Sequence, residues 1–266
     1  MDILLDGLGI PESLRWHEGR LWFSDWGAAE VRTLGPDGQS ELEVGVSTSL
    51  PISIDWLPDG RLLVVSGREG LLLRRDPGGE LETHGDLRAI DPLFNELVVD
   101  ARGNAYVNGA SLALVTLDGR VRREAGDLAF GNGMAITADG STLIVAESHG
   151  HRLTAFDIGA DGGLSGRRVW ADLGDAAPDG ICLDADGASW YADVPNRRCV
   201  RVREGGEVLE TIEADRGCFS CMLGGDDGRT LFVGAAEWSG MDRIADTAGT
   251  GRILAARVAV PHAGRP

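Results

Sequence analysis

A tight-turn motif followed by a run of β-forming residues recurs six times along this chain of 266 residues. The turn glycines lie at positions 19, 60, 103, 140, 187 and 228, so that successive spacings are 41, 43, 37, 47 and 41 residues. Asp-Gly between apolar runs is a strong β-hairpin signal, because glycine readily adopts the positive φ that the turn requires. A period near 40 residues with several strands per repeat is typical of a β-propeller.

Each repeat continues with a second apolar run and usually a further turn, such as Pro36-Asp37-Gly38, before a fourth short strand. The last repeat ends after its third strand, while the apolar run Ile3-Leu4-Leu5 precedes the first full repeat. We expect this N-terminal strand to become the outer strand of the last blade, because that pairing removes an open sheet edge. The sequence therefore predicts an all-β protein, a six-bladed β-propeller of four-stranded blades closed by the N-terminal strand. It forms one domain, residues 1–266, with little helix.

The chain carries 42 acidic and 25 basic residues, a formal net charge of -17. Such a field repels phosphate backbones and anionic membranes, so nucleic acid and membrane partners are not expected. No apolar run approaches the roughly 20 residues that cross a bilayer, and residues 1–6 lack the features of a secretory signal. We expect a cytoplasmic protein whose partner is a small-molecule substrate; the sequence does not determine the oligomeric state.

Four cysteines occur in the second half of the chain, at positions 182, 199, 218 and 221. Disulfides are not the default in a chain without a secretory signal. Cys218 and Cys221 have the spacing of a zinc knuckle, but no second such pair completes a tetrahedral site. We interpret these two cysteines as small apolar residues of a buried strand.

Polar residues recur at one position of the repeat, seven or eight residues before the turn glycine. In four repeats this residue is a carboxylate or an amide: Glu12, Asn95, Asn132 and Asp179. Inner strands of a propeller converge on its axis, so these oxygen-bearing side chains are expected to meet and to suit a hard cation such as Ca²⁺ or Mg²⁺. The alternative is that Asn and Asp beside Gly simply form turns; the shared position in four repeats favours a site.

Three segments resemble a known family: Asn132-Gly133-Met134, Pro178-Asp179-Gly180 and Ser165-Gly166-Arg167-Arg168-Val169-Trp170. They are similar to the SMP-30/gluconolactonase/LRE-like family, which includes regucalcin and bacterial gluconolactonases, and the resemblance extends over essentially the whole chain. It implies a six-bladed propeller with one divalent metal ion on its axis.

The same resemblance implies roles for individual residues. Glu12, Asn132 and Asp179 match the metal ligands of the family, Asn95 matches a substrate contact, and Asp179 also matches the general base of lactone hydrolysis. Oxygen-only ligands favour Ca²⁺, while Zn²⁺, Mn²⁺ and Mg²⁺ remain open.

Two departures from the family pattern bear on the substrate. Sugar lactonases of the family carry an arginine where this chain has Leu93, and Phe94 follows it. The loop after Asn108 is also short, which agrees with the shortest of the five repeat spacings. We therefore predict an open mouth and a substrate less polar than gluconolactone, with Leu93 and Phe94 among the residues that contact it.

Further candidates follow the strand that ends near Val145. His149 is predicted to contact substrate, whereas His151 is expected to be a solvated turn residue. Trp26 and Trp238 are candidates to line the mouth, and residues 237–242 have no assigned role.

The leading function is hydrolysis of a lactone or related ester; the alternatives are an organophosphate or fluorophosphate hydrolase and a non-catalytic metal-binding propeller.

Overall fold

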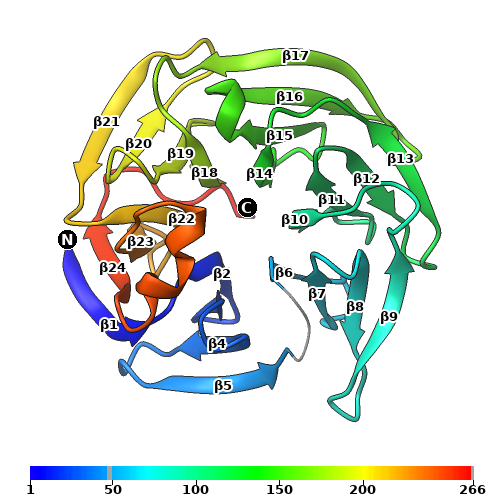
Figure 1. Cartoon of the computed structure of the whole chain (residues 1–266). Helices are drawn as coiled ribbons and strands as arrows, with labels where there is room; N and C mark the ends of the chain where they lie inside the picture. Colours follow the sequence, from blue (N-terminus) through cyan, green and yellow to red (C-terminus); the bar gives the residue numbers. More distant parts are fainter. Residues whose placement is uncertain (47–49, 265–266) are drawn as a thin grey trace.

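The computed structural model describes residues 1–46 and 50–264, and its strands form six four-stranded antiparallel sheets arranged as the blades of a ring (Figure 1). From the axis outward, blade 1 contains β2 (Pro11–His17), β3 (Arg20–Asp25), β4 (Glu30–Leu34) and β5 (Ser40–Gly45), and blade 2 contains β6 (Ile54–Trp56), β7 (Leu62–Ser66), β8 (Leu71–Arg75) and β9 (Leu81–Asp86). Blade 3 contains β10 (Phe94–Val99), β11 (Ala105–Gly109), β12 (Leu112–Val115) and β13 (Val121–Ala125), and blade 4 contains β14 (Gly131–Ile136), β15 (Thr142–Glu147), β16 (Arg152–Ile158) and β17 (Leu164–Asp172).

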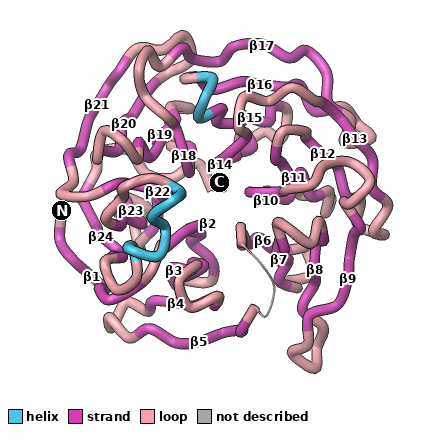
Figure 2. The backbone as a smooth tube through the Cα atoms, viewed as in Figure 1, coloured by secondary structure: helices cyan, strands magenta, loops and turns pink. Residues whose placement is uncertain are grey.

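Blade 5 contains β18 (Pro178–Leu183), β19 (Ser189–Asp193), β20 (Arg198–Val202) and β21 (Val208–Glu213). Blade 6 contains β22 (Gly217–Gly224), β23 (Thr230–Ala236), β24 (Gly251–Arg257) and β1 (Asp2–Leu8), so its outermost strand comes from the N-terminus. The predicted six-bladed propeller and its closure are therefore confirmed. The helical segments in the described ranges are two short 3₁₀ helices, η1 (Ser148–Gly150) and η2 (Met241–Thr247) (Figure 2).

The core consists of apolar side chains packed between neighbouring blades. The inner strands β18 and β22 are buried along their whole length, which removes their side chains from water and stabilises the ring. All four cysteines are free and buried in one apolar cluster with Leu14, Phe23 and Trp190. The interpretation of Cys218 and Cys221 as buried strand residues is confirmed.

The ring has two distinct ends. All six inner strands begin at one end, which we call the site face, and run to the six recurring hairpin turns at the other end, the hairpin face. The C-terminal segment crosses the hairpin face toward the axis, where the Ala185 N–H donates to Pro261 O (2.8 Å) and the Ala263 N–H to Leu183 O (3.0 Å) (Figure 1). The start of the inner strands therefore lies opposite the C-terminal segment.

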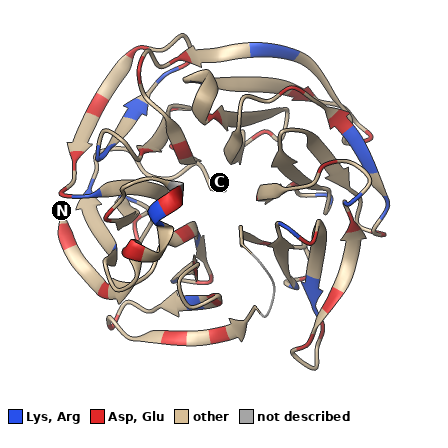
Figure 3. Cartoon of the chain, in the orientation of Figure 1, with Lys and Arg blue, Asp and Glu red and all other residues tan. Residues whose placement is uncertain are grey.

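Acidic side chains are spread around the ring, including its outer strands β1, β5, β9 and β21 (Figure 3). Among the described residues, no helix has the length and apolar character that crossing a bilayer requires.

Candidate functional site

The polar residues predicted to converge lie near the start of inner strands whose pairing is irregular. In β14 the register passes from Gly131↔Glu147 to Met134↔Val145, so the segment that contains Asn132 is bulged. Irregularities of the same kind occur in β2, β10 and β18, next to Glu12, Asn95 and Asp179. A β-bulge bends its strand and re-aims a side chain. The repeated bulge therefore changes the direction of these side chains from the one that regular alternation along a β-strand would give them.

The glycines that follow Asn132 and Asp179 allow the inner strands to approach closely. A Cβ on Gly133 would lie 2.4 Å from the carbonyl oxygen of Asp179, and a Cβ on Gly180 would lie 2.7 Å from the Cα of Ser220. No side chain fits at such distances, because real Cβ contacts are much longer. Gly133 and Gly180 are needed for this packing, which brings blades 4, 5 and 6 together at the axis.

Two of the four predicted residues are joined by a direct side-chain hydrogen bond, and a third lies next to a carbonyl of the same network. The Asn95 Nδ2 donates to the Asn132 Oδ1 (3.0 Å) and to the Gly131 carbonyl (3.3 Å). The Asn132 Nδ2 donates to the Ser148 hydroxyl (3.3 Å), which in turn donates to the carbonyl of Pro178, the residue before Asp179 (2.7 Å). Blades 3, 4 and 5 are thus joined by polar side chains at the site face.

Glu12 acts on Asp179 through its negative charge. Burial, followed by the negative charges of Glu12 and Glu96, raises the pKa of Asp179 well above its usual range. Burial and the charge of Glu96 also raise the pKa of Glu12 to about 8, although the Ser13 amide and the charge of Arg15 act in the opposite direction. The site therefore concentrates more negative charge than its own hydrogen bonds can stabilise.

This donor set fits a hard divalent cation. The Asp179 Oδ1 is buried without a hydrogen-bond partner among the described residues, and a bound cation would satisfy it. Neutral amide oxygens beside two carboxylates are ligands that Ca²⁺ accepts. No cluster of three or more His, Cys, Asp or Glu suited to a metal occurs within residues 1–46 and 50–264, so a cation at this place would depend on the amides as well.

Sequence reasoning missed a buried ion pair beside the site. The Arg15 guanidinium lies 3.1 Å from the Glu96 carboxylate and also donates to the carbonyls of Leu14 (2.9 Å) and Leu97 (2.8 Å). Glu96 accepts a further hydrogen bond from the Ser13 hydroxyl (3.3 Å). The sequence does show a carboxylate, Glu96, directly after Asn95. The direction in which the Glu96 side chain points depends on the bulge in β10, which the sequence does not reveal.

The residues predicted to contact substrate are not all exposed. Leu93 is 37% exposed and Asn95 is half-buried, but Phe94 has no exposed surface and packs in the core cluster of blades 2 and 3. The expectation that Phe94 contacts substrate does not fit this position, because the side chain points into the blade interface. The connection after β11 consists of residues 110–111 alone, as short as predicted.

His149 lies exposed at the site face and stacks on Phe130, with ring centroids 4.8 Å apart. His151 is an exposed turn residue whose Nδ1 lies 2.8 Å from the carbonyl oxygen of Ala176. Trp238 packs edge-on against Phe219, 5.3 Å between centroids, in the segment that connects β23 to β24 and contains η2. Aromatic side chains therefore occur around the end of the ring that holds the site.

Glu147 supports this region from inside. The fully buried carboxylate accepts hydrogen bonds from the guanidinium groups of Arg152 (3.1 and 3.0 Å) and Arg167 (3.2 Å), and from the backbone amide of Ala129 (2.7 Å). Because Glu147 bonds the Ala129 amide and immediately precedes the turn that contains His149, it connects the segment of Phe130 to that turn. Its role is structural.

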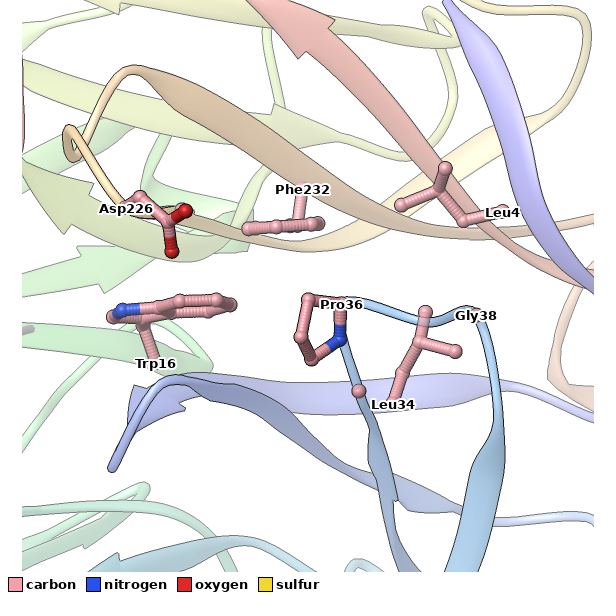
Figure 4. Close-up of a pocket in the computed structure, with 9 residues that line it drawn as sticks. Leu4, Trp16, Leu34, Pro36, Gly38, Asp226 and Phe232 are labelled. Carbon is pink, nitrogen blue, oxygen red and sulfur yellow. The ribbon is translucent and has the colours of Figure 1, made fainter.

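A cavity of about 280 Å³ lies elsewhere, at the hairpin face between blades 1 and 6. Trp16 and Phe232 line it as a stacked pair with ring centroids 5.4 Å apart, and Leu4, Leu34, Pro36 and Asp226 are among its other lining residues (Figure 4). Trp16 is near the end of β2, whereas Glu12 is near its start. This cavity is therefore separate from the polar group at the site face.

Comparison with known proteins agrees with this fold. The sequence matches the SMP-30/gluconolactonase/LRE-like region over residues 10–237, so the chain belongs to that family. It is 27% identical over 219 residues to 6-deoxy-6-sulfogluconolactonase of Pseudomonas putida, covering 76% of this chain and 75% of that protein.

Two solved structures share the fold. Regucalcin of Agrobacterium tumefaciens, described as a calcium-binding protein, superposes with a TM-score of 0.82 at 21% identity, over 99% of this chain and 95% of that one. A gluconolactonase of Xanthomonas campestris gives a TM-score of 0.78 at 22% identity, over 96% and 89% of the two chains.

Proposed function

We propose that this protein hydrolyses a lactone or a related ester with the help of one divalent cation held by Glu12, Asn132 and Asp179. The observation that carries the proposal is the buried Asp179 Oδ1, which has no hydrogen-bond partner in the described part of the chain and lies beside a second buried carboxylate and two amides. Membership of a family that includes lactonases supports the reaction class. The oxygen-only donors favour Ca²⁺, with Zn²⁺, Mn²⁺ and Mg²⁺ as alternatives.

Such a cation, when bound, polarises a substrate carbonyl and stabilises the negative charge that develops on its oxygen. The remaining chemistry falls to the chain. Asp179 accepts the proton of the attacking water as general base. Asn95 offers an amide for substrate oxygens, and the hydrogen bonds among Asn132, Ser148 and the Pro178 carbonyl keep the base in position.

The substrate is proposed to be less polar than gluconolactone. Leu93 presents 37% of its surface at the site face, where it offers no hydrogen bond to a sugar hydroxyl. The two-residue connection after β11 is too short to fold over the mouth. Both features favour a lactone with apolar substituents over a polyhydroxylated one.

The test combines metal analysis with a substrate panel. Protein purified without chelator is analysed for bound metal, stripped, reloaded with single cations and assayed on aliphatic, aromatic and sugar lactones and on a fluorophosphate. We expect Asp179→Asn to lower kcat by about 100-fold or more, as loss of a general base does. The matched control is Asp186→Asn, an exposed aspartate of a hairpin turn at the opposite end, which should retain full activity.

Each result distinguishes among the candidate functions. Full lactonase activity in Asp179→Asn would refute the base assignment, and activity without any divalent ion would refute the cation site. Turnover of a fluorophosphate but of no lactone would favour the organophosphate alternative. Tight cation binding without turnover of any substrate would favour a non-catalytic propeller.

A further inference from the structure

Phe130 is an aromatic residue in a backbone conformation that bulky side chains rarely adopt. Its φ is +61°, in the left-handed region, and 46% of its side chain is exposed. Both properties are unfavourable for phenylalanine, since the conformation is strained and the ring stays in water. A strained residue of this kind persists only where the surroundings fix it, and such residues cluster at binding sites.

The surroundings of Phe130 fix it through several hydrogen bonds. The backbone amides of Ser148 and His149 donate to the carbonyls of Phe130 and Ala129, each at 3.0 Å. The Ala129 amide donates to the buried Glu147 at 2.7 Å. The imidazole of His149 then lies against the phenyl ring, with the two planes 27° apart. The segment before β14 and the turn after β15 therefore form one rigid unit.

This unit borders the polar site. Asn132 follows Phe130 by two residues, and Asn95 donates to the carbonyl of the intervening Gly131. Leu93 lies close by on blade 3, because a Cβ on Gly109 would meet its carbonyl oxygen at 2.1 Å and Gly109 in turn packs against Gly131. Leu93 and the stacked pair of Phe130 and His149 thus lie on adjoining segments beside the amides of the site, and we call these three residues the aromatic ledge.

We propose that the aromatic ledge binds an aryl substituent of the substrate, and that Phe130 is its specificity-determining residue. This inference rests on the proposed function for its place in a reaction, but the binding itself does not depend on catalysis. An aryl ring stacked on Phe130 covers the apolar surface that is left in water, while the polar part of the ligand reaches Asn95 and Asn132. The energetic gain lies in apolar burial and ring stacking.

The test measures the binding of two lactams, which resist hydrolysis, by calorimetry. One is δ-valerolactam and the other is its phenyl-substituted derivative. We expect the wild-type protein to bind the phenyl derivative about tenfold more tightly, as one aromatic contact and its buried area allow. Phe130→Gly should reduce this affinity ratio to about twofold or less without lowering the melting temperature, because glycine adopts a positive φ without strain.

A second variant and a control separate the outcomes. His149→Ala should give an intermediate ratio, because Phe130 loses its support. Leu117→Ala, which removes a similarly exposed apolar side chain (48%) at the hairpin face, should leave the ratio unchanged.

Three results would each refute the proposal that the aromatic ledge binds an aryl group. They are an unchanged affinity ratio in Phe130→Gly, absence of binding by either lactam, and an affinity ratio that falls only together with the melting temperature. If the affinity ratio changes as expected but no lactone is hydrolysed under any condition, the proposed function is refuted while the proposal of an aryl-binding ledge is supported.

Discussion

Glu147 offers the sharpest test of how this end of the propeller is held together. Burial alone would raise the pKa of its carboxyl, but hydrogen bonds from Arg152, Thr154 and the Ala129 amide outweigh that effect and lower the pKa from its ordinary value of 4.5 to about 2. A difference of this size corresponds to about 3 kcal/mol of folding free energy at neutral pH. We therefore expect Glu147→Gln to lower the free energy of unfolding by about 2–3 kcal/mol, since glutamine keeps one acceptor oxygen but no charge.

The difference in unfolding free energy between wild type and Glu147→Gln should depend on pH in a defined direction. A carboxyl group whose pKa is depressed in the folded state stabilises the fold fully above its unfolded pKa, and the stabilisation is lost as the pH falls toward the folded value. The difference between wild type and Glu147→Gln should therefore be constant from pH 6 to 9, and it should shrink below about pH 4.5 as the unfolded-state carboxylate becomes protonated.

The measurement is urea denaturation at several pH values, together with the melting temperature, which should fall by about 5–10 °C for a chain of this size. The matched control is Glu207→Gln, because Glu207 is an exposed partner of Arg203 and such pairs contribute about 0–1 kcal/mol. A loss no larger in Glu147→Gln than in Glu207→Gln, or a difference that grows as the pH falls, would refute the reasoning.

Three further predictions follow from the packing. Gly133→Ala should destabilise the fold, because the new Cβ would meet the Asp179 carbonyl at 2.4 Å, and it should abolish the rise in melting temperature that the proposed cation site predicts on addition of Ca²⁺. Gly45→Ala, with open space around it, is the control in thermal melts. The four buried cysteines should resist a thiol-reactive dye in the native protein and all react in urea, and rapid native labelling would contradict their burial. Deletion of residues 1–7 should expose β24 as an open edge and promote association, measured by light scattering; a monomer of unchanged stability would argue against closure of the ring by β1.

The sequence predicted the parts of the site that follow from repetition. Glu12, Asn95, Asn132 and Asp179 share one position of the repeat, and equivalent positions in a closed ring converge for reasons of symmetry alone. Period-two alternation could also have excluded Phe94 from the mouth, because neighbouring residues of a strand point to opposite sides. The parts that break the repeat, such as the Arg15–Glu96 ion pair beside the site, could not be predicted in this way, since a local bulge decides where those side chains point.

The sequence by itself determined the number of blades, the closure of the ring by the N-terminal strand around Ile3-Leu4-Leu5 and the end of the ring at which polar groups gather. These are consequences of chain periodicity, which is local and can be counted. The tertiary structure decided that Glu96 adds its charge to the site, that Glu147 holds two loops together, and that Phe130 stays exposed in a strained conformation on His149. Those features arise from contacts between blades, where the close approach of backbones selects one direction for each side chain.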